Sequence, residues 1–147
     1  MADTSVQGEV ARFICDSFLP AHYGQAFSRQ RVRLSSGGEH GFAAVSANGQ
    51  IVGTICTGSA STAGGKNAAG KLTKVRADLF FLLLAEADQK FIVAVQPAMH
   101  DLLVAERDHY RRIPTQIKIF QGDVPAELAN RLRRSQEDAS AEVSPPA

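Results

Sequence analysis

Apolar positions recur at two different spacings along this chain, and the spacings predict where helices and strands lie. Between residues 5 and 19 they recur every three or four positions, as on the buried face of a helix that Pro20 is expected to end. From Arg29 to Leu34 arginines alternate with other residues, which is typical of a half-buried strand. The continuously apolar run from Phe91 to Val95 predicts a central strand that is covered on both faces.

A hairpin is predicted in the first half of the chain. Asn48-Gly49 lies between the apolar runs 42–46 and 51–57, and both turn residues tolerate the positive φ that a tight hairpin requires. Together with the strand at 29–34, these two runs are expected to form an antiparallel meander.

The remaining periodic segments complete a mixed α/β fold. Helices are predicted over 67–87, 98–112 and 125–137, and a further strand over 116–120. The order α-β-β-β-α-β-α-β-α predicts a central mixed sheet with helices on both sides. We expect one domain over residues 1–137 and a polar, disordered tail over 138–147, where prolines follow a run of small and charged residues.

Composition narrows the classes of function. The 147 residues carry a net charge of only +1, so any attraction for nucleic acid must come from a local patch. Cys15 and Cys56 lack CxxC spacing, which predicts free thiols in a reducing compartment and no zinc site. The first residues lack a signal-peptide pattern and the longest apolar run, 79–85, is too short to span a membrane. A soluble, cytoplasmic protein without membrane contact is expected.

The stretch GGKNAAGKLT, residues 64–73, contains the spacing G-x-x-x-x-G-K of a phosphate-binding loop. Leu72 stands where that loop needs the hydroxyl of Ser or Thr to hold Mg²⁺. The preceding strand is also expected in a hairpin, whereas a phosphate-binding loop follows the first strand of a parallel βαβ unit. We therefore interpret the spacing as accidental.

The same stretch still carries a basic cluster. No Asp or Glu occurs from residue 40 to residue 77, and the end of this interval contains Lys66, Lys71, Lys74 and Arg76. Lysines at a helix N-terminus favour phosphate, including the phosphates of duplex DNA. The alternative is a solvated basic face without a ligand.

The segment from Glu39 to Thr57, EHGFAAVSANGQIVGTICT, resembles the restriction-endonuclease-like, or PD-(D/E)XK, nucleases. The resemblance covers the order α-β-β-β-α-β and the hairpin spacing. It implies an Asp on the second strand and Glu-x-Lys on the third, which together hold Mg²⁺ and activate water. Laid over this chain, those positions fall on Ala43, Thr54 and Cys56, which cannot perform that chemistry.

The resemblance therefore implies a non-catalytic, nuclease-like domain that acts as a binding or structural module. No catalytic residue, metal site or cofactor is expected. Duplex DNA is the predicted partner of the basic patch, and the chain is expected to form a homodimer. One alternative is a Mg²⁺-dependent nuclease with a displaced site built from Glu9, Glu39 and His40. Another is a protein-interaction domain that works as a homodimer.

Overall fold

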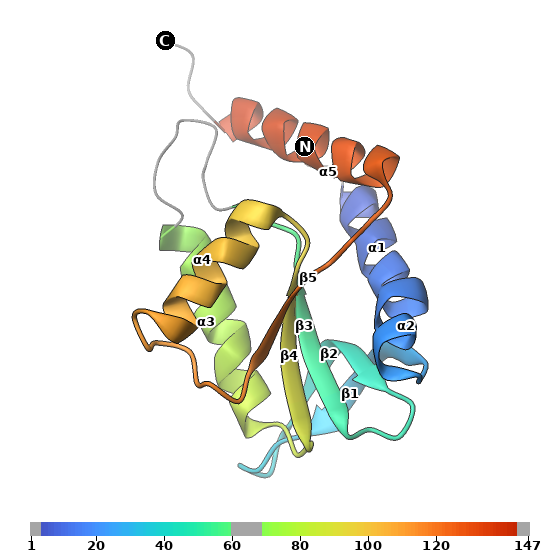
Figure 1. Cartoon of the computed structure of the whole chain (residues 1–147), viewed down its shortest axis with the longest axis vertical. Helices are drawn as coiled ribbons and strands as arrows, with labels where there is room; N and C mark the ends of the chain where they lie inside the picture. The colour runs from blue at the N-terminus through green and yellow to red at the C-terminus, as the bar shows by residue number, and fades with distance from the viewer. Residues whose placement is uncertain (1–3, 60–68, 144–147) are drawn as a thin grey trace.

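The computed structural model of the chain describes residues 4–59 and 69–143, in which helices cover both faces of a mixed sheet (Figure 1). The strands are β1 (Phe27–Arg33), β2 (Glu39–Ser46), β3 (Ile51–Cys56), β4 (Gln89–Ala94) and β5 (Lys118–Gln121). The helices are α1 (Thr4–Phe13), α2 (Leu19–Tyr23), α3 (Ala69–Leu84), α4 (Pro97–Asp108) and α5 (Ala126–Val143). A π-helical turn, Ile14–Phe18, joins α1 to α2. This order confirms the predicted mixed α/β class.

The five strands lie in the order β1-β2-β3-β4-β5. β2 is antiparallel to both β1 and β3, and β3, β4 and β5 run parallel to one another. The predicted meander is confirmed. Gly49 has a φ of 74° in the turn between β2 and β3, and the Asn48 side chain accepts a hydrogen bond from the Gln50 backbone N–H.

One expectation about β3 was wrong. The strand belongs to a hairpin with β2, as predicted, but it also pairs in parallel with β4, so β3-α3-β4 is a parallel βαβ unit. Hairpin membership therefore does not argue against a phosphate-binding loop after β3. The argument from Leu72 remains, because this side chain is half-buried and packs against the core under α3.

The N-terminal helix does not end at Pro20, contrary to prediction. The π-helical turn ends at Phe18, two residues before Pro20, and its last bond runs from the Leu19 N–H to the Ile14 carbonyl. A proline inside a helix lacks one N–H and crowds the preceding turn, and wider π spacing accommodates it. The helix continues to Gly24, whose left-handed conformation ends it.

The sheet separates two cores. On one face α3 and α4 pack over β2, β3 and β4, and on the other face lie α1, α2 and α5 (Figure 1). α5 extends to Val143, past residue 138, where the sequence predicts the tail to begin. Within the described ranges, no helix has both the length and the apolar character that crossing a membrane requires.

Candidate binding site

A cavity of about 300 Å³ lies at the carboxyl end of β3, between the sheet and α3. Ligands in α/β proteins bind preferentially at the carboxyl ends of parallel strands, and β3 is parallel to β4. The side chains that give this cavity its chemistry are Thr54, Cys56, Lys71, Lys74, Asp78 and Gln136.

The spacing of residues along β3 and α3 explains why their polar side chains face the cavity. Val52 packs in the core under α3, so strand alternation directs Thr54 and Cys56 to the same face. On α3, Lys71, Lys74 and Asp78 follow one another at intervals of three and four residues and therefore share one side of the helix. Thr54 and Cys56 of β3 therefore line the cavity together with the ammonium groups of two lysines and the carboxylate of Asp78.

The Cys56 thiol is held in its neutral form. Burial raises its pKa, and the charge of Asp78 acts in the same direction. A hydrogen bond with the Gly58 backbone and the charges of Lys74 and Lys71 lower the pKa, without overcoming the effect of burial. Because the thiolate is the nucleophile and the metal ligand, Cys56 is poorly suited to either role at neutral pH.

Two glutamines from distant elements bond to the backbone of Thr57 beside the cavity, and one of them, Gln136, also lines it. Gln136 of α5 and Gln96, just before α4, both donate hydrogen bonds to the Thr57 carbonyl, at 2.7 and 2.9 Å. The Gln96 amide also donates to the Gln136 side-chain oxygen. These bonds attach the second half of α5 to the ends of β3 and β4.

The structure brings two of the three degenerate catalytic positions together and separates the third. Thr54 and Cys56 line the cavity under α3, whereas Ala43 lines a second cavity beside α1, where its carbonyl accepts a hydrogen bond from the Cys15 thiol at 3.4 Å. A bulge causes the difference, because Ala43 and Ala44 together face Arg29 between the pairs Ser28–Val45 and Gln30–Phe42.

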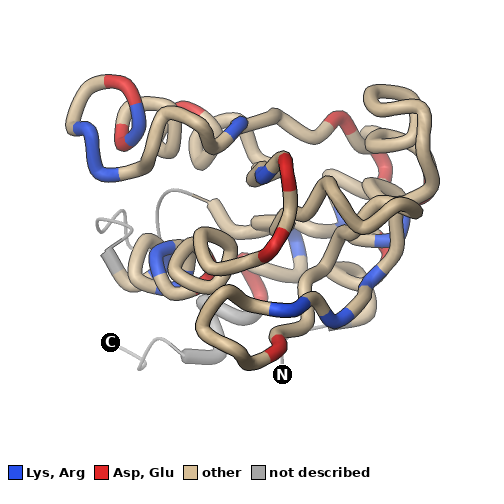
Figure 2. Tube along the Cα trace, turned by 90° about the horizontal axis from the view of Figure 1, so that it is seen from below, with Lys and Arg blue, Asp and Glu red and all other residues tan. Residues whose placement is uncertain are grey.

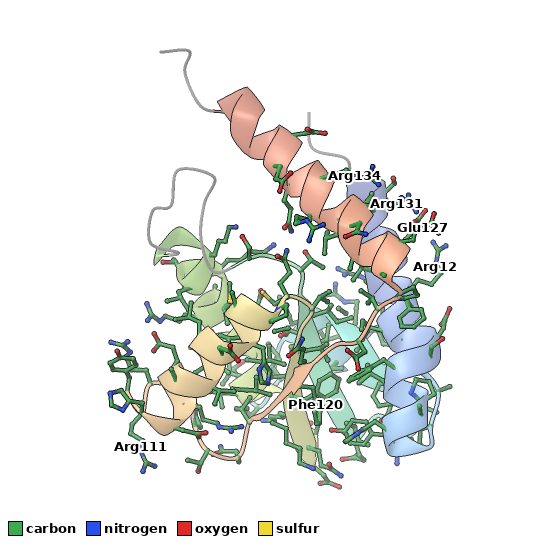
Figure 3. The ribbon with its side chains drawn as sticks, turned by 45° about the horizontal axis from the view of Figure 1, so that its top comes forward. Arg12, Arg111, Phe120, Glu127, Arg131 and Arg134 are labelled. Atoms are coloured by element: carbon green, nitrogen blue, oxygen red, sulfur yellow. The ribbon has the colours of Figure 1, made fainter. Side chains whose placement is uncertain are left out.

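The residues of the displaced-site alternative lie apart. Glu9 forms an ion pair with Arg131 of α5 at 2.7 Å, and Figure 3 shows Arg131 beside α1. Glu39 pairs with Arg31 at 3.3 Å, and the His40 ring stacks on Phe81 with 4.1 Å between ring centroids. In the part of the chain that the structure describes, no group of three His, Cys, Asp or Glu side chains could hold a metal ion.

The predicted basic cluster divides into two parts. Lys71 and Lys74 line the cavity, and the Lys71 ammonium donates to the Ser59 hydroxyl at 3.1 Å. Arg76 instead turns toward the buried carboxylate of Glu106 on α4, at 3.5 Å. Lys66 lies outside the described residues. Cys15 and Cys56 are both free thiols, as predicted.

Sequence reasoning missed the remaining polar groups of the cavity. Asp78 carried a usable signal, because it lies one helical turn after Lys74 on a helix that was predicted. Gln7 and Gln136 carried none, since each reaches the cavity from a helix far from β3 in sequence. Comparisons of this chain with protein-family models, curated proteins and solved structures give no match.

Proposed function

We propose that this chain is a non-catalytic binding module on a nuclease-like α/β scaffold, and that the cavity at the end of β3 holds a phosphate group of its ligand. The observation that carries the proposal is that Lys71 and Lys74 line one cavity together with Thr54 and Cys56. In the nucleases that this chain resembles, the positions of Thr54 and Cys56 hold an acid and a lysine. Here both side chains are neutral, and the two lysines of α3 line the same cavity.

The charges and donors of the cavity favour an anion. Two ammonium groups outweigh the single carboxylate of Asp78, and the Thr54 hydroxyl supplies a neutral donor. Lys71 also lies in the first turn of a helix of 16 residues, where backbone N–H groups and the helix dipole attract negative charge. Asp78 would repel a phosphate that lay too deep, and it can accept a hydrogen bond from a ligand hydroxyl.

The same residues argue against hydrolysis of the bound phosphate. A metal-dependent phosphodiesterase needs several oxygen ligands for its cation, and Asp78 is the one carboxylate among the described lining residues. Threonine is a weak neutral ligand, and the half-buried Cys56 thiol stays protonated. The arrangement can bind and orient a phosphate, but it offers no group that would activate water.

Phosphate binding is tested by titrating the protein with pyrophosphate at constant ionic strength, with ¹H–¹⁵N chemical shifts of β3 and α3 as the readout. We expect Lys74→Gln to weaken binding about tenfold, because it removes a charge-assisted hydrogen bond. Asp78→Asn should strengthen binding, since it removes the like charge. Lys118→Gln is the matched control, because Lys118 lies on β5 and donates to Gln89. Equal affinities of all four proteins would contradict the proposal.

The absence of catalysis is tested on the same preparations. We expect no cleavage of supercoiled plasmid with Mg²⁺ or Mn²⁺. Robust cleavage that is lost in Glu9→Ala would instead support the displaced-site nuclease.

A further inference from the structure

β1 forms one edge of the sheet and pairs only with β2 (Figure 1). The direction of its backbone groups follows from the bonds at its two ends. The Ala26 carbonyl accepts a hydrogen bond from the Ala47 N–H, and the Leu34 N–H donates to the Gly38 carbonyl. Because backbone groups alternate in direction along an antiparallel strand, the even-numbered residues bond toward β2 and the odd-numbered residues point outward.

The outward side of β1 is closed at one end and open in the middle. The Arg33 carbonyl accepts a hydrogen bond from the Glu86 N–H at 3.0 Å, so the segment after α3 covers that end. Within the described ranges, no backbone hydrogen bond outside the β2 pairing involves Arg29 or Arg31. Their N–H and C=O groups form a short row that can pair with another extended chain.

The side chains along this row are basic. Val32 packs against the core under α3 and Phe27 against the core under α1, so Arg29, Arg31 and Arg33 share the α1 side of the strand. The side chains of Arg31 and Arg33 are 69% and 75% exposed, and their partners Glu39 and Glu86 lie at 3.3 and 3.9 Å. Exposed pairs of this kind contribute little and can be exchanged.

A cavity adjoins the start of the row. It measures about 290 Å³ and lies between α1 and β1, next to the bulge at Ala43. Arg12 and Arg29 line it, together with one acid, Asp16. A pocket beside an open strand edge is the feature that gives specificity to the side chains of an added strand.

We propose that β1 accepts an extended acidic segment of another protein, which adds a sixth strand to the sheet and places alternate Glu or Asp side chains along Arg29, Arg31 and Arg33. Its backbone pairs with the outward groups of Arg29 and Arg31, and an acidic side chain near Ser28 enters the cavity beside Arg12. Charge selects this occupant. In a symmetric pairing of two copies of β1, arginines would oppose arginines, which is unfavourable.

The test uses the intact protein and a blocked, fluorescein-labelled peptide, Gly-Glu-Val-Glu-Val-Glu-Gly. Anisotropy at 50 mM NaCl is expected to show saturable binding. The peptide in which Lys replaces each Glu should not bind, and N-methylation of alternate backbone amides on the pairing side should abolish binding. Arg29→Gln/Arg31→Gln is expected to weaken binding by about tenfold or more. Arg133→Gln/Arg134→Gln is the matched control, with the same change of charge on exposed residues of α5.

Hydrogen exchange separates strand addition from charge attraction alone. The amides of Arg29 and Arg31 are expected to become protected when the Glu peptide binds, because their N–H groups point outward. Binding without this protection, or equal loss of affinity in both double variants, would overturn the proposal. So would tighter binding of duplex DNA that depends on Arg29 and Arg31, or pairing of β1 with a second copy, detected as a dimer that the peptide does not dissociate.

Discussion

Glu106 shows how much a single residue can organise in this fold. Its side chain is buried on α4, and its carboxylate accepts hydrogen bonds from the Arg112 guanidinium at 2.6 and 2.9 Å. Arg76 of α3 lies at 3.5 Å, and Arg112 also covers the Tyr110 ring. One carboxylate thus connects α3, α4 and the turn after α4, where Arg111 takes a φ of 59°.

We expect Glu106→Gln to lower the free energy of unfolding by about 1–3 kcal/mol at pH 7, because the negative charge is lost and an NH₂ group replaces one of the two oxygens that accept from Arg112. The Arg112 hydrogen bond holds the pKa of Glu106 below its usual range, in spite of burial. A lowered folded-state pKa gives stability that is complete above the unfolded-state pKa, about 4.3, and is lost as pH falls through the folded value.

The difference between wild type and Glu106→Gln is therefore expected to be largest at neutral pH and to shrink as the pH falls below about 4.3. Urea unfolding at several pH values measures it. Asp101→Asn is the control on the same helix, since its side chain is 82% exposed. A Glu106→Gln protein that is as stable as wild type at pH 7 would contradict this account.

At the scale of elements, sequence patterns predicted the strands and turns whose structure depends on residues close together in the chain. Asn48-Gly49 and the apolar runs on either side of it predicted the β2–β3 hairpin, and the apolar run 91–95 predicted a buried central strand. The bulge at Ala43 was not predictable, because it depends on how β1 pairs with β2. The same bulge removes Ala43 from the cavity that Thr54 and Cys56 share, so a spacing-based alignment of the three positions fails there.

Gly53 of β3 lets the sheet pack closely at its centre. A Cβ at this position would lie 2.2 Å from the Phe91 ring, which is fully buried in the core under α1. We expect Gly53→Ala to destabilise the fold by about 1–3 kcal/mol, because the ring must move. Denaturant unfolding tests this.

Gly8→Ala is the control, and it should not destabilise the fold, since nothing lies within 4 Å of a Cβ at this position. In helix α1 that substitution should stabilise by up to about 1 kcal/mol. Phe91→Leu combined with Gly53→Ala should cost less than the sum of the two single changes, because both act on one contact. Strict additivity would show that the ring is not the cause.

At the scale of the whole molecule, basic and acidic residues are interspersed along the chain (Figure 2). In the predicted basic cluster Arg76 has an acidic partner, Glu106, and elsewhere three further arginines also pair with acids: Arg31, Arg33 and Arg131. Sequence identified Lys71 and Lys74 correctly as neighbours, since helical spacing fixes their relation. It could not show which cations face acids across the fold, and so it did not separate Arg76 from the two lysines of the cavity.

This distribution predicts how the protein would respond to duplex DNA. If Lys71 and Lys74 make the phosphate contacts, a plot of log K against log salt concentration should have a slope of about −1.8, or about −0.9 for each phosphate neutralised. The slope is measured by the anisotropy of a labelled duplex between about 25 and 200 mM NaCl, a range over which the screening of charges changes strongly. Lys71→Gln/Lys74→Gln should flatten the slope by about one unit per lysine, and Lys118→Gln should leave it unchanged. A slope steeper than about −4 would require more phosphate contacts than these two lysines provide, and DNA would then contact a surface beyond this cavity.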